Sequence, residues 1–201
     1  MLFVGGIVSM LLIENADRIS HSAFRLFEVA FMMVLILLLL CLNKWGSITV
    51  PVPVEVGFVA FSFCSLILGD VADFYARFEW WDLILHGISG ILLGLLGYMI
   101  LIRISPSPVF LAAGIICFSL ALGSLWEIME YVTDGVFGLN SQQFLESSGT
   151  FDSTIPLQGR MALRDTMQDM IMNLIGALTV AAGSFLFKKH EFRHEHTIHR
   201  K

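Results

Sequence analysis

The stretch WWDLILHGISGILLGLLGYMILI, residues 80–102, decides how this chain folds. The hydrocarbon core of a bilayer is about 30 Å thick, and a helix of about 20 apolar residues crosses it. The stretch is long enough, and an acid and an imidazole, Asp82 and His86, stand four residues apart near its beginning. It therefore predicts a membrane-spanning helix that presents two ionisable side chains on one face.

The composition of the whole chain agrees with a membrane protein. Of its 201 residues, 56% are hydrophobic and 14% are charged, whereas soluble domains average about 25% charged residues. The net charge is −5 and the three cysteines all lie in apolar runs, which excludes a disulfide-rich secreted scaffold and a nucleic-acid partner. We expect membrane lipids to be the principal partners, and the sequence leaves the oligomeric state open.

Apolar segments recur along the chain, with short turn-like joints between most of them. We predict an all-α fold, a polytopic transmembrane helix bundle of about six spans, formed by a single domain over residues 1–187. A basic, His-rich cytoplasmic tail follows over residues 188–201, and we expect it to be solvated and partly disordered. The long polar connection at residues 134–164 is predicted to be an extracytoplasmic loop. The predicted spans are residues 1–13, which are short, 24–42, 54–75, 80–102, 109–132 and 165–187.

The basic residues predict the orientation of the bundle. Six spans place both termini on one side, and that side carries seven Lys and Arg residues against five on the other. The positive-inside rule therefore predicts that both termini are cytoplasmic. Acidic residues are distributed far less evenly, because 14 of the 17 Asp and Glu residues belong to the opposite, extracytoplasmic side. Since acids do not set topology, this accumulation needs another explanation.

Three of the predicted spans carry sets of polar residues at that same end. The members of each set stand three or four residues apart and so share a helix face. At about 1.5 Å per residue, the sets lie at similar depths inside their spans. Small residues continue the same faces toward the other side of the membrane, where they favour close helix packing. We therefore expect the sets to converge above a tightly packed floor. The sets are Asp82 with His86, Glu127 with Glu130, and Asp165 with Asp169 and Asn173; the small residues are Gly90, Gly94, Gly97, Ser119, Gly123, Gly176, Thr179 and Gly183.

Buried carboxylates at this density predict a bound cation. Each costs about 2.5–3.5 kcal/mol at the centre of a span and less near the interface, and neighbouring like charges add to that cost. A divalent metal ion would remove this conflict directly. An oxygen-rich ligand set with one imidazole suits Mg, Mn, Ca or Zn. Asp134 lies closest to a loop, and we expect it to have only a structural role. The predicted metal ligands are His86, Glu127, Glu130 and Asp169.

The motifs around these residues also carry a resemblance. The run Arg77-Phe-Glu-Trp-Trp-Asp82 with His86-Gly87, the Trp126-Glu127 block with Glu130-Tyr131, and Asp165-Thr166 with Asp169 and Asn173 resemble the YjdF-like family. That resemblance covers about residues 70–176 and implies a multi-span protein of the bacterial cytoplasmic membrane with no established activity. More distantly, the spacing is similar to that of VanZ-like membrane proteins, which are linked to resistance to the glycopeptide antibiotic teicoplanin. Leu83 stands where VanZ-like proteins typically carry Lys.

Three hypotheses of function follow. The first is a metal-dependent hydrolase or transferase that acts on a lipid-linked envelope substrate, with Asp82 or Asp165 as the general base on a metal-bound water. Two arginines would hold a phosphate or carboxylate of that substrate. Its predicted substrate-binding residues are Arg160, Arg164, Trp80, Trp81 and Asn173. The second hypothesis is a cation- or proton-coupled transporter or channel, which requires a polar path to the cytoplasmic side. The third is a non-catalytic factor in envelope assembly or glycopeptide tolerance.

Overall fold

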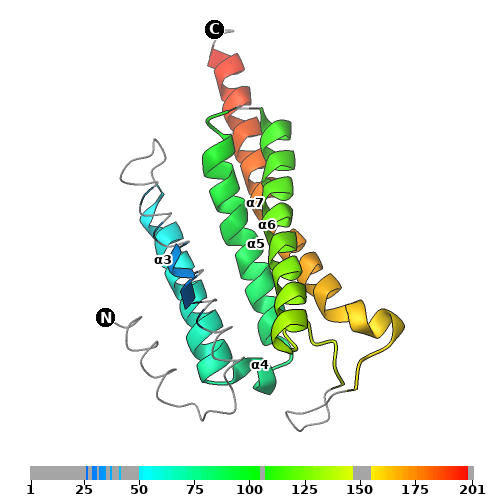
Figure 1. Ribbon diagram of the computed structural model, residues 1–201. Coiled ribbons are helices and arrows are strands. Elements are labelled where there is room, and N and C mark those ends of the chain that lie inside the picture. Colours follow the sequence, from blue (N-terminus) through cyan, green and yellow to red (C-terminus); the bar gives the residue numbers. More distant parts are fainter. Residues whose placement is uncertain are drawn as a thin grey trace.

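A computed structural model describes residues 50–104, 107–146 and 155–198, together with eight positions between 26 and 41. Within these residues the chain is helical and has no strand, and a lone bridge pairs Leu145 with Pro156 in the long loop. The predicted all-helical fold is thus confirmed for this part of the chain. The elements in chain order (Figure 1) are α3 (Val52–Ser62), the π-helix η2 (Phe63–Val71), α4 (Phe74–Arg77), α5 (Trp81–Leu101), α6 (Pro108–Phe137), the 3-10 helix η3 (Gly159–Leu163) and α7 (Arg164–Ile198).

Among the residues that the structure describes, four helical segments are long and apolar enough to cross a membrane, and each corresponds to a predicted span. The two remaining predicted spans, residues 1–13 and 24–42, lie outside the described residues except for helical positions scattered between 26 and 41. The fold is therefore polytopic, and the count of six spans stays a prediction. The four segments are Val52–Val71, Trp81–Leu101, Pro108–Phe137 and Gly159–Phe187.

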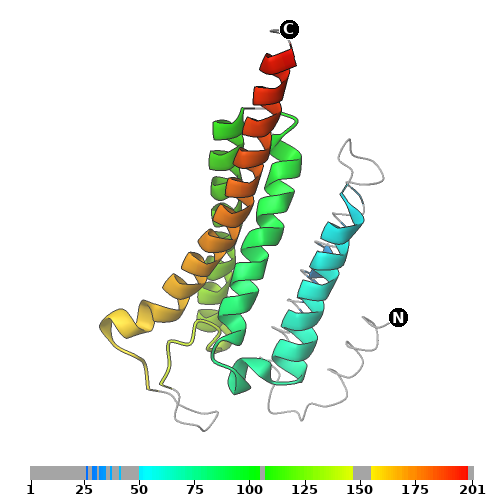
Figure 2. The ribbon, with the colours of Figure 1, turned by 180° about the vertical axis from the view of Figure 1, so that it is seen from behind.

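Helices α5, α6 and α7 pack along one another and form the body of the bundle (Figures 1 and 2). They approach closely because glycines stand at the contacts. A Cβ atom at Gly90 would overlap the backbone of Asn173, and one at Gly176 would overlap the carbonyl of Gly87. At Gly94, a Cβ atom would meet a neighbouring side chain at 3.2 Å. The close packing predicted below the polar sets is confirmed at these positions.

Two of the predicted packing positions on α7 do not take part in this contact. Thr179 is exposed and its hydroxyl donates to a carbonyl one turn back, and a Cβ atom at Gly183 would meet nothing within 4 Å. The prediction was wrong for both residues. The contact continues from Gly176 to Val180, which packs against Gly94.

The segment predicted to span residues 54–75 is shorter and less regular than expected. Its first half, α3, packs apolar side chains against α5 around Leu92. Its second half is the π-helix η2, and the following turn contains Asp73 in the left-handed conformation, with a φ of 63°. The turn folds back onto η2, where the Tyr75 hydroxyl lies 3.1 Å from Ser65 Oγ in a hydrogen bond. The span therefore ends at Val71.

Two other predicted boundaries also move. Helix α6 runs on to Phe137 and ends at Gly138, which has the left-handed φ of 67° that is common after a helix. The long loop therefore begins after Asp134 rather than at it. Helix α7 continues to Ile198, beyond the predicted end of the span at residue 187, and the solvated tail stays a prediction. Residues 188–198 include no Pro or Gly, and extending an existing helix adds one hydrogen bond for each residue fixed.

Candidate functional site

The beginning of α5, the end of α6 and the beginning of α7 lie at the same end of the bundle (Figure 1). Among the ionisable side chains from these helices that are buried there, His86 is 9% exposed, Glu127 is 5% exposed and Asp169 is 1% exposed. Asp82 and Asp165 stand in the first turns of α5 and α7. The positive end of each helix dipole therefore favours negative charge at this level of the bundle.

Asp82, His86 and Asp169 form the closest group, called here the three-residue group. One potential ligand atom of each lies within 4.8 Å of the other two, and His86 Nε2 is 3.5 Å from Asp82 Oδ1. Two ligands that are each about 2.0–2.1 Å from a tetrahedral zinc ion are roughly 3.3 Å from each other. The Asp82–His86 spacing thus suits a shared metal ion, and a small side-chain movement would bring in Asp169.

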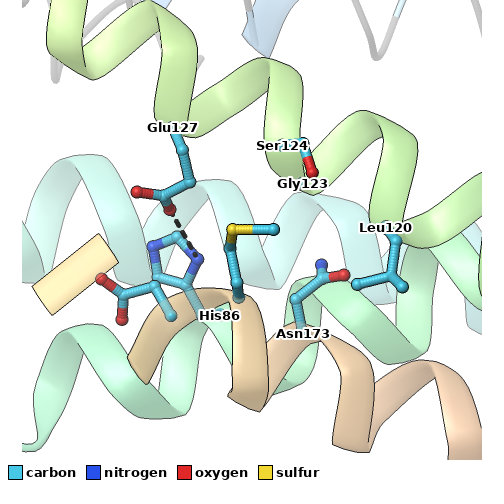
Figure 3. A pocket seen from close by; sticks show the side chains of 8 residues that line it. His86, Leu120, Gly123, Ser124, Glu127 and Asn173 are labelled. Atoms are coloured by element: carbon cyan, nitrogen blue, oxygen red, sulfur yellow. Dashed lines mark ion pairs between the residues drawn. The ribbon is translucent and has the colours of Figure 1, made fainter. Parts of the chain in front are cut away.

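Glu127 approaches His86 from a different direction. Its Oε1 atom lies 3.7 Å from Nδ1, the ring nitrogen that is not directed at Asp82 (Figure 3). The imidazole is therefore held between an acid of α5 and an acid of α6. Glu127 was predicted to be a metal ligand, and it lies outside the three-residue group.

Several buried carboxylate oxygens accept no hydrogen bond within the described part of the chain. They are both oxygens of Asp169 and Oδ2 of Asp165, whereas Glu127 has the Thr166 side chain as a hydrogen-bond partner. A buried polar atom without a partner costs about 1–3 kcal/mol, and more when the group is charged. Among the same described residues, no arginine forms an ion pair with any of these acids. The cluster is therefore rich in negative charge and short of counter-charge, which suits a cation.

Two further acids at this end have partners within the protein. Trp126 Nε1 donates to Glu130 Oε1 at 2.8 Å, one helical turn along α6. The Asp134 carboxylate accepts the backbone N–H groups of Ser141 at 2.8 Å and Gln142 at 3.0 Å. These bonds anchor the loop that follows α6, which is consistent with the structural role expected of Asp134. Glu130, a predicted metal ligand, lies outside the three-residue group.

A small hollow beside His86 is also lined by Asn173 (Figure 3). It holds about 170 Å³ that is free of atoms, including space open to solvent. Asn173 is 1% exposed, accepts a hydrogen bond from Ser119 at 3.2 Å and donates one to Ser89 at 3.4 Å. Because these partners belong to α6 and α5, Asn173 joins all three helices at the floor of the site. It was predicted to bind substrate.

The other predicted substrate-binding residues lie nearer the surface at this end of the bundle. Trp80 is 50% exposed, while Trp81 is half-buried and packs edge-on against Phe74, with ring centroids 4.9 Å apart. Arg160 in η3 and Arg164 at the start of α7 are both exposed. The structure therefore separates a buried acidic cluster from a surface that carries arginine and tryptophan.

The loop after α6 adds residues that the sequence did not single out. Gln142 Nε2 donates to Thr166 Oγ1 at 2.9 Å, and the Gln143 side chain hydrogen-bonds with Asp82. Gln143 has a φ of 46°, which is uncommon for a residue other than glycine. Residues in a loop follow no helical spacing, so the sequence could not predict the roles of Gln142 and Gln143. Thr166 could have been predicted, because it adjoins Asp165 at the polar beginning of α7.

Comparison with known proteins assigns the chain to a family. Residues 1–190 match the family described as predicted membrane protein (DUF2238). A Thermotoga maritima protein, described as uncharacterized, is 30% identical over 126 residues, which are 59% of this chain and 55% of that protein. The chain thus spans about half the length of this relative. No solved structure matches the chain, and neither match supports the VanZ resemblance. The chain belongs to the DUF2238 family of predicted membrane proteins, which is the YjdF-like group that its motifs resemble.

Proposed function

We propose that this protein is a hydrolase or transferase that depends on a divalent metal ion. The ion would bind within the membrane, through Asp82, His86 and Asp169. One observation carries the proposal. The Asp169 side chain is 1% exposed, neither of its oxygens accepts a hydrogen bond from a described residue, and one of them lies within 4.8 Å of ligand atoms of Asp82 and His86. A buried carboxylate in that position is stabilised best by a cation.

The ligand set also suits catalysis. One imidazole nitrogen and two carboxylates leave at least one position open on a four-coordinate ion, as in catalytic zinc sites. The hollow lined by His86, Glu127 and Asp169 adjoins that position, and side chains there must move to admit a water molecule. A bound divalent metal lowers the pKa of such a water toward about 7, which makes hydroxide available at neutral pH.

Neighbouring residues have roles in the same reaction. Asp165 is a candidate general base, because its Oδ2 is buried and accepts no hydrogen bond from the described residues. The exposed Arg160 and Arg164 would bind a phosphate group, and Trp80 and Trp81 would sit at the membrane interface. The hollow, at about 170 Å³, is too small for a whole lipid headgroup. We therefore propose a lipid-linked envelope substrate whose reacting group reaches the site from the extracytoplasmic surface of the inner membrane.

The test begins with metal retention by the purified full chain. The tail carries four histidines that would bind metal by themselves, so all measurements use a chain in which His190, His194, His196 and His199 are replaced by Asn. We expect close to one zinc or manganese ion per chain after dialysis, and none in Asp169→Asn. Glu79→Gln, which removes an exposed carboxylate near the start of α5, is the matched control and should retain the metal. Equal retention in Asp169→Asn, or no retention in the parent chain, contradicts the proposal.

Activity is tested separately, with a polyprenyl diphosphate in liposomes as the probe. We expect metal-dependent release of inorganic phosphate, with loss in Asp165→Asn and retention in Glu79→Gln. In this step the water oxygen bonds to the terminal phosphorus, one water proton passes to Asp165, and the bridging phosphorus–oxygen bond breaks, so that the polyprenyl phosphate leaves and inorganic phosphate is released. Metal binding without phosphate release would remove this substrate class and leave the metal site standing.

The transport hypothesis ranks lower because the described parts of α5, α6 and α7 pack directly against one another below the site. Asn173 is bonded to Ser119 and Ser89 there, and the backbones at Gly90 and Gly176 are in direct contact with α7 and α5. A transport path would have to pass through this contact. Cation flux into liposomes that is lost in Asp82→Asn would favour transport over hydrolysis.

A further inference from the structure

We infer that Glu127 is a positioning residue that makes the site selective for metal ions that bind imidazole, such as Co²⁺ and Zn²⁺, over Mg²⁺ and Ca²⁺. The inference rests on the metal site proposed above and concerns which metals that site accepts. It assigns to Glu127 a contact with the His86 ring in place of a bond to the metal.

The two nitrogens of His86 face different acids. Nε2 lies 3.5 Å from Asp82 Oδ1, within the three-residue group, and Nδ1 lies 3.7 Å from Glu127 Oε1 (Figure 3). A neutral imidazole carries one proton, and only the nitrogen without it can bind a metal. If the proton is on Nδ1, it points to Glu127, and the lone pair of Nε2 points to the position between Asp82 and Asp169.

Glu127 is well placed to hold the proton on Nδ1. Its side chain is 5% exposed on the buried face of α6, where its carboxylate lies between the Thr166 side chain and the His86 ring. The present distance of 3.7 Å is longer than a hydrogen bond, and such contacts often tighten when a ligand binds. Histidines that bind metals commonly donate their second N–H to a carboxylate, which fixes the ring and increases its basicity.

The orientation of the His86 ring matters most for metals that gain binding free energy from an imidazole ligand. Mg²⁺ and Ca²⁺ bind oxygen ligands and gain little from an imidazole. Co²⁺ and Zn²⁺ bind imidazole readily. Asp82 and Asp169 offer oxygens to every divalent ion, so the His86 nitrogen is the ligand that separates the two classes. Loss of the carboxylate at position 127 should therefore weaken Co²⁺ binding more than Mg²⁺ binding.

The experiment measures the affinities of Co²⁺ and Mg²⁺ by calorimetry in the full chain with the four tail histidines replaced by Asn. Substituting a carboxylate that orients a metal-binding histidine typically reduces affinity about 10–100-fold, and we expect this for Co²⁺ in Glu127→Gln. Removing one negative charge weakens both divalent ions equally, so the ratio of the two affinities isolates the contribution of the histidine. We expect that ratio to fall at least tenfold in Glu127→Gln and to stay unchanged in Glu79→Gln.

An equal loss for both ions would overturn the inference, because Glu127 would then act through charge or packing alone. No Co²⁺ binding in the parent chain would instead contradict the metal site itself. A further readout does not depend on the folding of any Glu127 variant. Nitrogen NMR of histidine-labelled parent chain, with the His86 signals assigned by their loss in His86→Asn, should show the proton on Nδ1. A proton on Nε2 in the metal-free chain would overturn the inference.

Discussion

The two ends of the α5–α6–α7 bundle bury opposite kinds of side chain. Toward the beginning of α6, Leu111 and Ile115 are fully buried, and Gly94 lies against the side chain of Val180. Toward the beginnings of α5 and α7, Asp169 is buried just as deeply, but its oxygens lack a hydrogen-bond partner among the described residues. The first end gains stability from its contacts. The second keeps unpaired acids that are costly in a membrane, which is typical of a functional site.

The largest effect should come from disturbing the packed region. In Gly90→Leu, the new side chain would collide with the backbone of Asn173 and force α5 away from α7. Overpacking costs about 1–3 kcal/mol even where neighbouring side chains can move, so we expect a loss of about 3 kcal/mol or more in unfolding free energy. Thermal unfolding in detergent, followed by tryptophan fluorescence, measures the loss. Gly183→Leu is the control and should change the unfolding temperature little, because a Cβ there meets nothing within 4 Å; an equal effect of both changes would contradict the proposed contact.

A smaller effect of opposite sign is expected in the acidic region. Asp169→Asn removes a buried charge without a hydrogen bond and adds an amide N–H that can donate to Asp82. In the presence of a chelator, the variant should therefore be more stable than the parent chain by about 1–3 kcal/mol. The same unfolding assay in saturating zinc should reverse the order, because only the parent chain gains binding energy. A variant that is less stable under both conditions would mean that Asp169 has a structural role.

The smallest effect should come from the acid that already has partners. Asp134→Ala removes the acceptor of the Ser141 and Gln142 N–H groups, so we expect a loss of about 1–2 kcal/mol in stability with or without metal. Metal affinity measured by calorimetry should stay within about threefold, since Asp134 does not belong to the three-residue group. A loss of metal binding as large as that of Asp169→Asn would place Asp134 in the site and weaken the contrast between the two acids.

Hydropathy and helical spacing predicted much of this arrangement. The length of the apolar segments predicts α5, α6 and α7, and the four-residue spacing of Asp82 and His86 predicts that both face the same way. These features depend only on distances along one helix. The predicted floor was also largely correct, because small residues such as Gly90 act wherever two helices cross closely.

The details that distinguish one acid from another depend on contacts between helices, which no spacing along one helix specifies. Glu127 and Glu130 lie on similar faces of α6, yet one faces His86 and the other accepts a hydrogen bond from Trp126. Trp126 stands four residues before Glu130, so the sequence contained a signal for that bond. The sequence contained no signal that shows which ring nitrogen of His86 faces Asp82 and which faces Glu127.

The central claim is that a metal ion binds between Asp82, His86 and Asp169. It is tested most directly by the zinc-edge X-ray absorption spectrum of the zinc-loaded full chain, with the four tail histidines replaced by Asn. We expect one imidazole nitrogen and carboxylate oxygens at about 2.0–2.2 Å from the zinc, and loss of the imidazole signal in His86→Asn. A site with two or more imidazoles, or a spectrum unchanged by His86→Asn, would contradict it.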